Sequence, residues 1–378
     1  MLEYSKFLIK RLYNKKSNLI ICLVSLLIIV FTLVMNIRNQ SIFEDMIQSG
    51  IKSSQEIISI NKERYEMDAD PYAKKAIEIN EKQIKAFESM QNDYDQKNWE
   101  SLYVSYIEVL EKRKNAVKAT AVQENSDTFN QLEYFNKDLN YFRYLLNNDL
   151  TYENMDYSIY GLTFTTQFFD VVGPISVLLL SVYLMIQLYL SDRKKDLDYS
   201  CIIPIGKNKV RLTKLLLGIV ISVSIFLIHF IFSLIVSWAL TRNSGFNYPF
   251  AILGSDGKWI IESININVVK WISMAILFYA NVSVFAYLIC QGIKDATTSF
   301  LVIILVIVGM SYLPNFVPVL CSFAQWLPTT YMRYVSVING IVSSSYNNFH
   351  ITWTLGMVVL AISLTFQLIF SMLLIKKD

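Results

Sequence analysis

The sequence predicts an all-α membrane protein with about six transmembrane helices and a helical extracellular insertion between the first and the second. Of its 378 residues, 53% are hydrophobic and only 17% are charged, and the mean hydropathy is +0.37. A soluble globular chain carries about a quarter charged residues. The charges also gather in one block near the N-terminus and are almost absent from long stretches elsewhere. This distribution indicates a membrane domain plus a water-exposed insertion.

Six apolar runs are long enough to cross a bilayer, because a helix that rises about 1.5 Å per residue needs roughly 20 apolar residues. We interpret the first run as a span and not as a signal peptide, because no small-residue cleavage site follows it. The fifth run is short, and Gly309 and Pro314 fit a helix that stops near the interface. The predicted spans are 18–35, 168–190, 215–240, 271–292, 298–313 and 353–375.

Basic residues in the short connecting segments predict the orientation. They precede the first span, lie between the second and third and between the fourth and fifth, and follow the last. The positive-inside rule then places these segments and both termini in the cytoplasm. The 241–270 loop is longer and poorer in basic residues, which suits the outer face. Tryptophans near the predicted outer ends fit an aromatic belt; they are Trp259, Trp271, Trp326 and Trp353.

The polar stretch 36–167 separates the first two spans and is predicted to be an extracellular helical domain. Asp70 and Pro71 form an N-cap followed by proline at the first helical position. Apolar residues recur at helical spacing after Pro71 and again after Trp99, which predicts a helical hairpin. A third segment, 132–146, is rich in Tyr and Phe. The domain either recognises or guides cargo, or is a cap that packs on itself or on a second copy.

Catalytic motifs are missing from the sequence. No G-x-x-x-x-G-K-[ST] phosphate loop is present, and Gly206-Lys207-Asn208 lacks both the upstream glycine and the Ser/Thr that binds magnesium. Two histidines are too few for most histidine-based metal sites, and a net charge of +3 is too small to indicate nucleic-acid binding. The sequence also contains no hydrolase motif, which argues against catalysis. The chain is therefore predicted not to be an enzyme and to bind no cofactor directly. No cysteine pair has metal-ligand spacing among Cys22, Cys201, Cys290 and Cys321.

The 191–214 segment is predicted to be a cytoplasmic loop that contains a short helix from Lys195 to Ile203. A solvated loop explains its charges, but the Ile-Ile-Pro-Ile cluster at 202–205 needs a surface to pack against. A proline, a small residue, basic residues and a lysine at the head of the third span follow in order. They are Pro204, Gly206, Lys207, Lys209, Val210 and Lys214. In this order the segment resembles the coupling region of the type-2 permease family of ABC exporters.

Two further segments carry the same resemblance. Residues 1–17 form an amphipathic stretch that resembles the family's cytoplasmic connecting helix. The 314–350 segment resembles the family's outer re-entrant helices and contains Leu327-Pro328-Thr329-Thr330-Tyr331. Gly206 stands where the family often has Ser, and the Gly-Thr that commonly precedes the coupling turn is replaced by Lys195-Asp196. The resemblance covers the membrane part of the chain and not the 36–167 insertion.

The resemblance implies a permease that works as a pair with a second copy or a paralogue, each seated on a cytoplasmic ABC ATPase subunit that binds ATP and Mg. It implies that the ATPase contacts the coupling loop, where we expect Lys195, Asp196, Leu197, Asp198, Ile202, Ile203 and Pro204 to carry the contact. Polar side chains inside spans either line a transport pathway or bond neighbouring helices. These candidates are Gln187, His229, Asn281 and Gln367.

The expected cargo is an apolar or amphipathic peptide, such as a toxin, bacteriocin, pheromone or antimicrobial peptide. The apolar spans and the Lys-, Asn- and Ile-rich composition, which indicates a low-GC bacterium and its plasma membrane, favour this interpretation. Export of lipids, drugs or a surface polymer is the alternative within the same class. A membrane receptor or scaffold with an outer sensing domain, and an ion-coupled secondary transporter, are alternatives of other classes.

Overall fold

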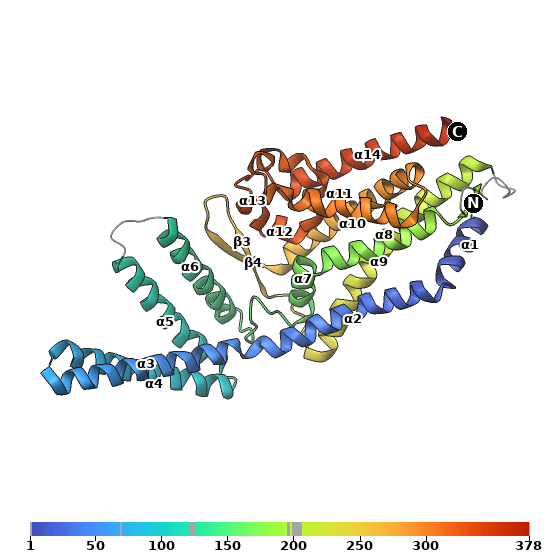
Figure 1. Cartoon of the computed structure of the whole chain (residues 1–378). Helices are drawn as coiled ribbons and strands as arrows, with labels where there is room; N and C mark the ends of the chain where they lie inside the picture. The colour runs from blue at the N-terminus through green and yellow to red at the C-terminus, as the bar shows by residue number, and fades with distance from the viewer. Residues whose placement is uncertain (1, 69, 121–125, 195–196, 199–205, 378) are drawn as a thin grey trace.

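The computed structural model describes all of the chain except residues 1, 69, 121–125, 195–196, 199–205 and 378. The described residues form helices and two small antiparallel sheets. One part of the molecule is a helical bundle that has both chain termini near the same end (Figure 1). The other part is a helical unit, α3–α6, which extends from the opposite end of the bundle (Figure 1).

Five helices of the described residues are long and apolar enough to cross a membrane, and six if one bent pair is counted as a span. This confirms the predicted mostly helical fold with about six helices that are apolar enough to span a membrane. The helix that contains the third predicted span begins at Lys207 instead of 215, and the helix that contains the fourth begins at Ile264 instead of 271. The spanning helices are α2 (Lys16–Arg38), α9 (Lys207–Thr241), α10 (Ile264–Gly292), α11 (Ala296–Tyr312) and α14 (Trp353–Lys377), with the bent pair α7 (Gly161–Val171) and α8 (Gly173–Tyr189).

The second predicted span, 168–190, is a broken helix. Helix α7 begins at Gly161, and α8 continues after a bend of 69°. Pro174 lies in the first turn of α8, where its lack of an N–H group costs no helical hydrogen bond. Gly173 is equally constrained, because a Cβ atom there would lie 2.7 Å from the Phe169 ring. The prediction of one continuous helix is therefore wrong at this joint.

Four helices build the α3–α6 unit, where the sequence predicted two helices and a third segment. The side chain of Asp70 accepts a hydrogen bond of 2.9 Å from the backbone N–H of Tyr72, which confirms the predicted N-cap. The first helix of the unit, α3, was not predicted. The helices are α3 (Ile42–Asp68), α4 (Pro71–Asp95), α5 (Trp99–Thr120) and α6 (Ser126–Asn147), and the short 3-10 helix η1 (Asn39–Ser41) joins α2 to α3.

An aromatic core holds the α3–α6 unit together. Phe43 from α3 packs edge-on against Tyr106 from α5 at a centroid distance of 5.0 Å. Tyr106 packs in turn against Phe142 from α6 at 4.5 Å. Aromatic pairs of this geometry add about 0.5–1.5 kcal/mol each beyond the area they bury. This core is separate from the larger apolar core of the bundle.

A hairpin and a run of short helices cover the bundle end nearest to α3–α6 (Figure 1). The hairpin was not predicted within the 241–270 loop; its strands are β3 (Pro249–Leu253) and β4 (Trp259–Ser263). The backbone N–H of Leu253 donates to the Asn339 carbonyl at 2.8 Å, which ties the hairpin to the short helices. The 314–350 segment contains η3 (Leu313–Asn315), η4 (Pro318–Trp326), η5 (Pro328–Arg333), α12 (Tyr334–Ile338) and α13 (Ile341–Ser345).

Candidate functional site

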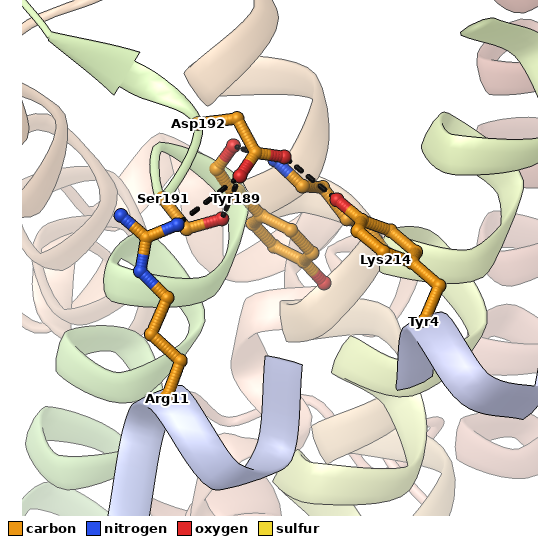
Figure 2. Close-up of polar contacts among 6 residues, drawn as sticks. All are labelled: Tyr4, Arg11, Tyr189, Ser191, Asp192 and Lys214. Carbon is orange, nitrogen blue, oxygen red and sulfur yellow. Dashed lines mark hydrogen bonds and ion pairs between the residues drawn. The ribbon is translucent and has the colours of Figure 1, made fainter. Parts of the chain in front are cut away.

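The carboxylate of Asp192 is the centre of a polar cluster at the bundle end that carries the termini (Figure 2). The residue follows α8 directly and is only 5% exposed. Its carboxylate accepts hydrogen bonds from Tyr4 Oη at 2.7 Å and from Arg11 at 3.2 Å, and Lys214 Nζ lies 2.9 Å away. One buried carboxylate therefore joins the N-terminal helix α1 (Leu2–Tyr13), the end of α8 and the start of α9.

Lys214 is the second buried charge of the cluster. Its side chain is 7% exposed, and Nζ also donates to the Tyr189 carbonyl at 3.2 Å. Tyr189 Oη is hydrogen-bonded to Ser283 on α10, which extends the cluster to a third bundle helix. A buried ammonium group needs an opposite charge and hydrogen-bond acceptors to remain ionised. Asp192 and the Tyr189 carbonyl supply both.

Helix α1 lies against the bundle through one face. Tyr4 and Leu8 are buried on this face, whereas Phe7, Ile9 and Lys10 are exposed. Helix α1 covers most of the 1–17 segment, for which an amphipathic helix was predicted. Its exposed side carries apolar Phe7 and Ile9 as well as Lys10.

Two contacts fix the corner between α1 and α2. Asn18 donates to the carbonyl of Leu12 at 2.9 Å, and Lys15 Nζ donates to Gln187 Oε1 at 2.7 Å. Gln187, a predicted pathway residue, is therefore occupied by a contact between α8 and the corner that follows α1. Its observed role is to position the corner.

The environment of Asp192 favours its ionised form. Burial raises the pKa of the carboxyl group, but the ammonium group of Lys214, the hydroxyl of Tyr4 and the guanidinium of Arg11 together outweigh it, so the pKa is below its ordinary value. The Asp192–Lys214 contact is therefore an ion pair at neutral pH. Nothing in the sequence distinguishes Asp192 from Asp196 or Asp198, so its role becomes visible only in the structure.

Five of the seven predicted coupling residues lie outside the described residues: Lys195, Asp196, Ile202, Ile203 and Pro204. The other two, Leu197 and Asp198, form strand β2 (Leu197–Asp198), which pairs antiparallel with β1 (Arg193–Lys194). The prediction of a helix is wrong for these two residues. In this pairing Arg193 lies opposite Asp198 and Lys194 lies opposite Leu197.

The coupling segment 193–206, which joins Asp192 to α9, is fastened at both ends. Asp192 immediately precedes it, and α9 begins immediately after it at Lys207. The ion pair between Asp192 and Lys214 bridges the two flanks at 2.9 Å. The same carboxylate contacts α1 through Tyr4 and Arg11.

The predicted pathway residue His229 bonds a neighbouring helix. It is buried, and its Nδ1 lies 2.7 Å from the Ile225 carbonyl one turn earlier in α9. Its Nε2 lies 3.0 Å from Ser25 Oγ on α2. Since a carbonyl oxygen only accepts, Nδ1 carries a proton in this arrangement. The observed role of His229 is thus to join α9 to α2.

The other two pathway candidates, Asn281 and Gln367, are brought together between α10 and α14. Asn281 Nδ2 donates to the Leu360 carbonyl at 3.0 Å, and Gln367 Nε2 lies 3.4 Å from Asn281 Oδ1. Gln367 Oε1 is buried and has no hydrogen-bond partner among the described residues. Of the four candidates, the structure joins only this pair.

The part of the chain that the structure describes contains no group of three or more His, Cys, Asp or Glu residues placed to hold a metal ion. Comparison of the chain with protein-family models, with curated proteins and with solved structures finds no match.

Proposed function

We propose that the chain is the transmembrane permease subunit of an ATP-driven exporter and that a separate ATPase subunit docks on the coupling segment 193–206. The observation that carries the proposal is the Asp192 cluster. It ties the two flanks of this segment to each other and to α1. A segment that transmits force to membrane helices needs such an attachment, because a loosely held loop would move without moving the helices.

In the proposed mechanism the partner ATPases bind ATP and Mg in the cytoplasm, and two copies of this chain, or this chain and a paralogue, enclose the pathway. ATP shifts the assembly only if it binds one conformation more tightly than the other. This chain receives the resulting motion at 193–206. The ion pair of Asp192 with Lys214 then moves α8 and α9 as one unit, and α1 follows through Tyr4.

The proposed cargo is an apolar or amphipathic peptide, and the proposed location is a bacterial plasma membrane with both termini in the cytoplasm. The apolar faces of the spanning helices support a cargo of this kind. Lipids, drugs or a surface polymer are the alternative cargo.

The second candidate function is a membrane receptor or scaffold. The specific observation in its favour is that α3–α6 has an aromatic core of its own, as a domain that binds a partner would. A receptor of this kind would not require an ATPase on the coupling segment. The two candidates therefore differ in what binds at 193–206.

A pull-down in mild detergent tests the proposal. The full chain is isolated from its native membranes beside an Ile203→Glu variant, and bound proteins are identified by mass spectrometry. A matched control is Ile260→Glu, which changes an isoleucine on β4 that is 52% exposed. The proposal expects an ABC ATPase with the wild type and with the control, and its loss from Ile203→Glu. A folded wild-type protein that binds no ATPase contradicts the proposal and favours the receptor.

A further inference from the structure

A cavity of about 160 Å³ lies where the bundle meets the α3–α6 unit and the β3–β4 hairpin. Its walls come from α6, the 153–158 segment, α7, the hairpin and the α12–α13 region. A cavity of roughly 150 Å³ is large enough to hold a molecule the size of benzene. The cavity lies at the opposite end of the bundle from the Asp192 cluster, and the proposed function does not use it.

Carboxylates dominate the charge of this cavity. Glu153, Asp156 and Asp170 line it, and Lys137 is the single basic residue among the lining residues that the structure describes. Asp170 is held in place by Ser336, which donates to Oδ1, and by Asn339, which lies 3.4 Å from Oδ2. The cavity therefore presents a net negative charge at a fixed position.

Glu153 is the most deeply buried of these carboxylates, with 1% of its surface exposed. The backbone N–H groups of Ile159 and Tyr160 donate to it at 2.6 and 2.8 Å, and Thr163 Oγ1 donates at 2.7 Å. All three bonds end on Oε1. The second oxygen, Oε2, receives no hydrogen bond from the described residues. A buried carboxylate with one vacant oxygen is stabilised by a ligand that brings positive charge and N–H donors.

Thr166 adds an independent observation. Its side chain is 4% exposed, its hydroxyl has no hydrogen-bond partner among the described residues, and it lines the same cavity. An orphaned buried hydroxyl in a native structure requires an explanation. A ligand with several N–H groups would satisfy the Thr166 hydroxyl together with Glu153.

We propose that this cavity binds a small organic cation through a primary ammonium or guanidinium group, which contacts Glu153, Asp170 and the Thr166 hydroxyl. The proposal goes beyond the proposed exporter function and does not rest on it. Aromatic residues of the wall favour an organic cation. Tyr141 and Phe250 offer apolar surface to the organic part of the ligand, whereas the Trp259 face already holds Lys137 Nζ at 4.9 Å from its ring centroid.

Binding should depend on pH near neutrality. Burial raises the pKa of Glu153 to about 7, although its three hydrogen bonds lower it in part. A proton on Glu153 removes the negative charge that holds the ligand, so affinity rises as pH increases through 7. The other titratable groups that line the cavity or surround Glu153 are Lys137, Tyr141, Tyr152, Asp156, Tyr160, Asp170 and Tyr248.

Isothermal titration of the purified full chain in detergent tests the proposal, with ethylguanidinium and n-butylammonium as probes and neutral N-ethylurea as the matched comparison. Saturable binding of a cationic probe is expected, about tenfold or more tighter than N-ethylurea, because a hydrogen bond to a charged group contributes about 1.5–3 kcal/mol. Glu153→Gln should weaken binding of the cationic probe by a similar factor, and Thr166→Val should weaken it by less. Asp256→Asn, a carboxylate change in the exposed turn of the hairpin, should leave binding unchanged.

Three outcomes overturn the proposal: no saturable binding of either probe, equal binding of N-ethylurea, or complete displacement of the probe by equal concentrations of sodium or calcium. Unchanged affinity in a folded Glu153→Gln variant also overturns it. If that variant does not fold, the wild type and Thr166→Val are titrated at pH 6 and pH 8. Tighter wild-type binding at pH 8 together with weaker binding by Thr166→Val supports the proposal, and any other result contradicts it.

Discussion

Replacing Asp192 by Asn preserves the shape of the side chain and removes the negative charge at the centre of the coupling cluster. Lys214 then remains buried and still donates to the Tyr189 carbonyl. Breaking a buried ion pair by removing one partner costs roughly 3–5 kcal/mol. Asparagine keeps one oxygen for Tyr4 Oη, and Arg11 is partly exposed and can be solvated. We therefore expect a loss near the lower limit, about 3 kcal/mol.

A second substitution separates the ion pair from the shape of the site. Lys214→Met removes the buried ammonium group and keeps an unbranched apolar side chain. Replacing both members of a buried pair is often close to neutral, because no unpaired charge remains. The double variant Asp192→Asn with Lys214→Met should therefore be less destabilised than the sum of the single variants. The expected coupling energy is about 1–3 kcal/mol.

Two measurements check this prediction. Unfolding by SDS in mixed micelles gives the free-energy change of each variant, and hydrogen–deuterium exchange reports whether α1 stays attached. The backbone amides of Leu2–Tyr13 should exchange faster in Asp192→Asn than in the wild type, because Tyr4 and Arg11 lose their charged acceptor. Asp256→Asn is the control at the opposite end of the molecule. Unchanged exchange in α1, or single effects that simply add in the double variant, would refute the reasoning.

The remaining predictions concern the other end of the bundle and the packing within it. The pKa of Glu153 rises from an ordinary 4.5 to about 7, so between these pH values the folded chain keeps a proton that the unfolded chain has lost. The free energy of unfolding should therefore fall by about 3 kcal/mol as pH rises from 4.5 to 7. Glu153→Gln should remove this pH dependence when unfolding is measured at several pH values. Gly218→Ala places a Cβ atom 1.8 Å from Tyr189 Oη and should lower the unfolding temperature through about 1–3 kcal/mol of overpacking, whereas Gly309→Ala, which meets no atom within 4 Å, should not. Gly340→Ala should also destabilise the folded chain in the same thermal assay, because φ is +77° and a Cβ atom would lie 2.1 Å from a backbone oxygen of β3.

The membrane helices could be predicted from sequence because apolar length alone largely determines them. Each of the six predicted runs overlaps a helix or helix pair of the structure that is long and apolar enough to span. The break in the second run was missed, although Gly173-Pro174 stood within it as a local signal. Hydropathy is averaged over a window of many residues, so one glycine and one proline barely change it. The missing N–H group of the proline nevertheless interrupts the helix at that single position.

Two elements, α3 and the β3–β4 hairpin, were missed although their signals are present in the sequence. Helix α3 places Phe43, Ile47 and Ser54 on its buried side, and these steps of four and seven residues are helical. The high polarity of the stretch hid the pattern. The β3–β4 hairpin has a turn with glycines at 254 and 257 between β-branched and aromatic residues, which is a hairpin signal.

The contacts of the candidate sites could not be predicted, because they join residues that lie far apart in the chain. Tyr4 and Asp192 are 188 positions apart, and no local pattern connects them. The same holds for His229 and Ser25, which are separated by 204 positions. A polar residue in an apolar span predicts that some partner exists, but helix packing decides which one.

The two candidate sites lie at opposite ends of one broken helix. Thr166 and Asp170 lie on α7 and line the cavity. Asp192 follows α8 and is the centre of the polar cluster at the other end (Figure 2). A straight helix would carry a displacement from one end to the other as a rigid rod. The 69° bend instead divides the path into two rods that meet at Gly173, beside Phe169, and α9 packs against both rods. At the Gly173 joint, a displacement of α7 at the cavity either moves α8 as well or is taken up by a change in the bend.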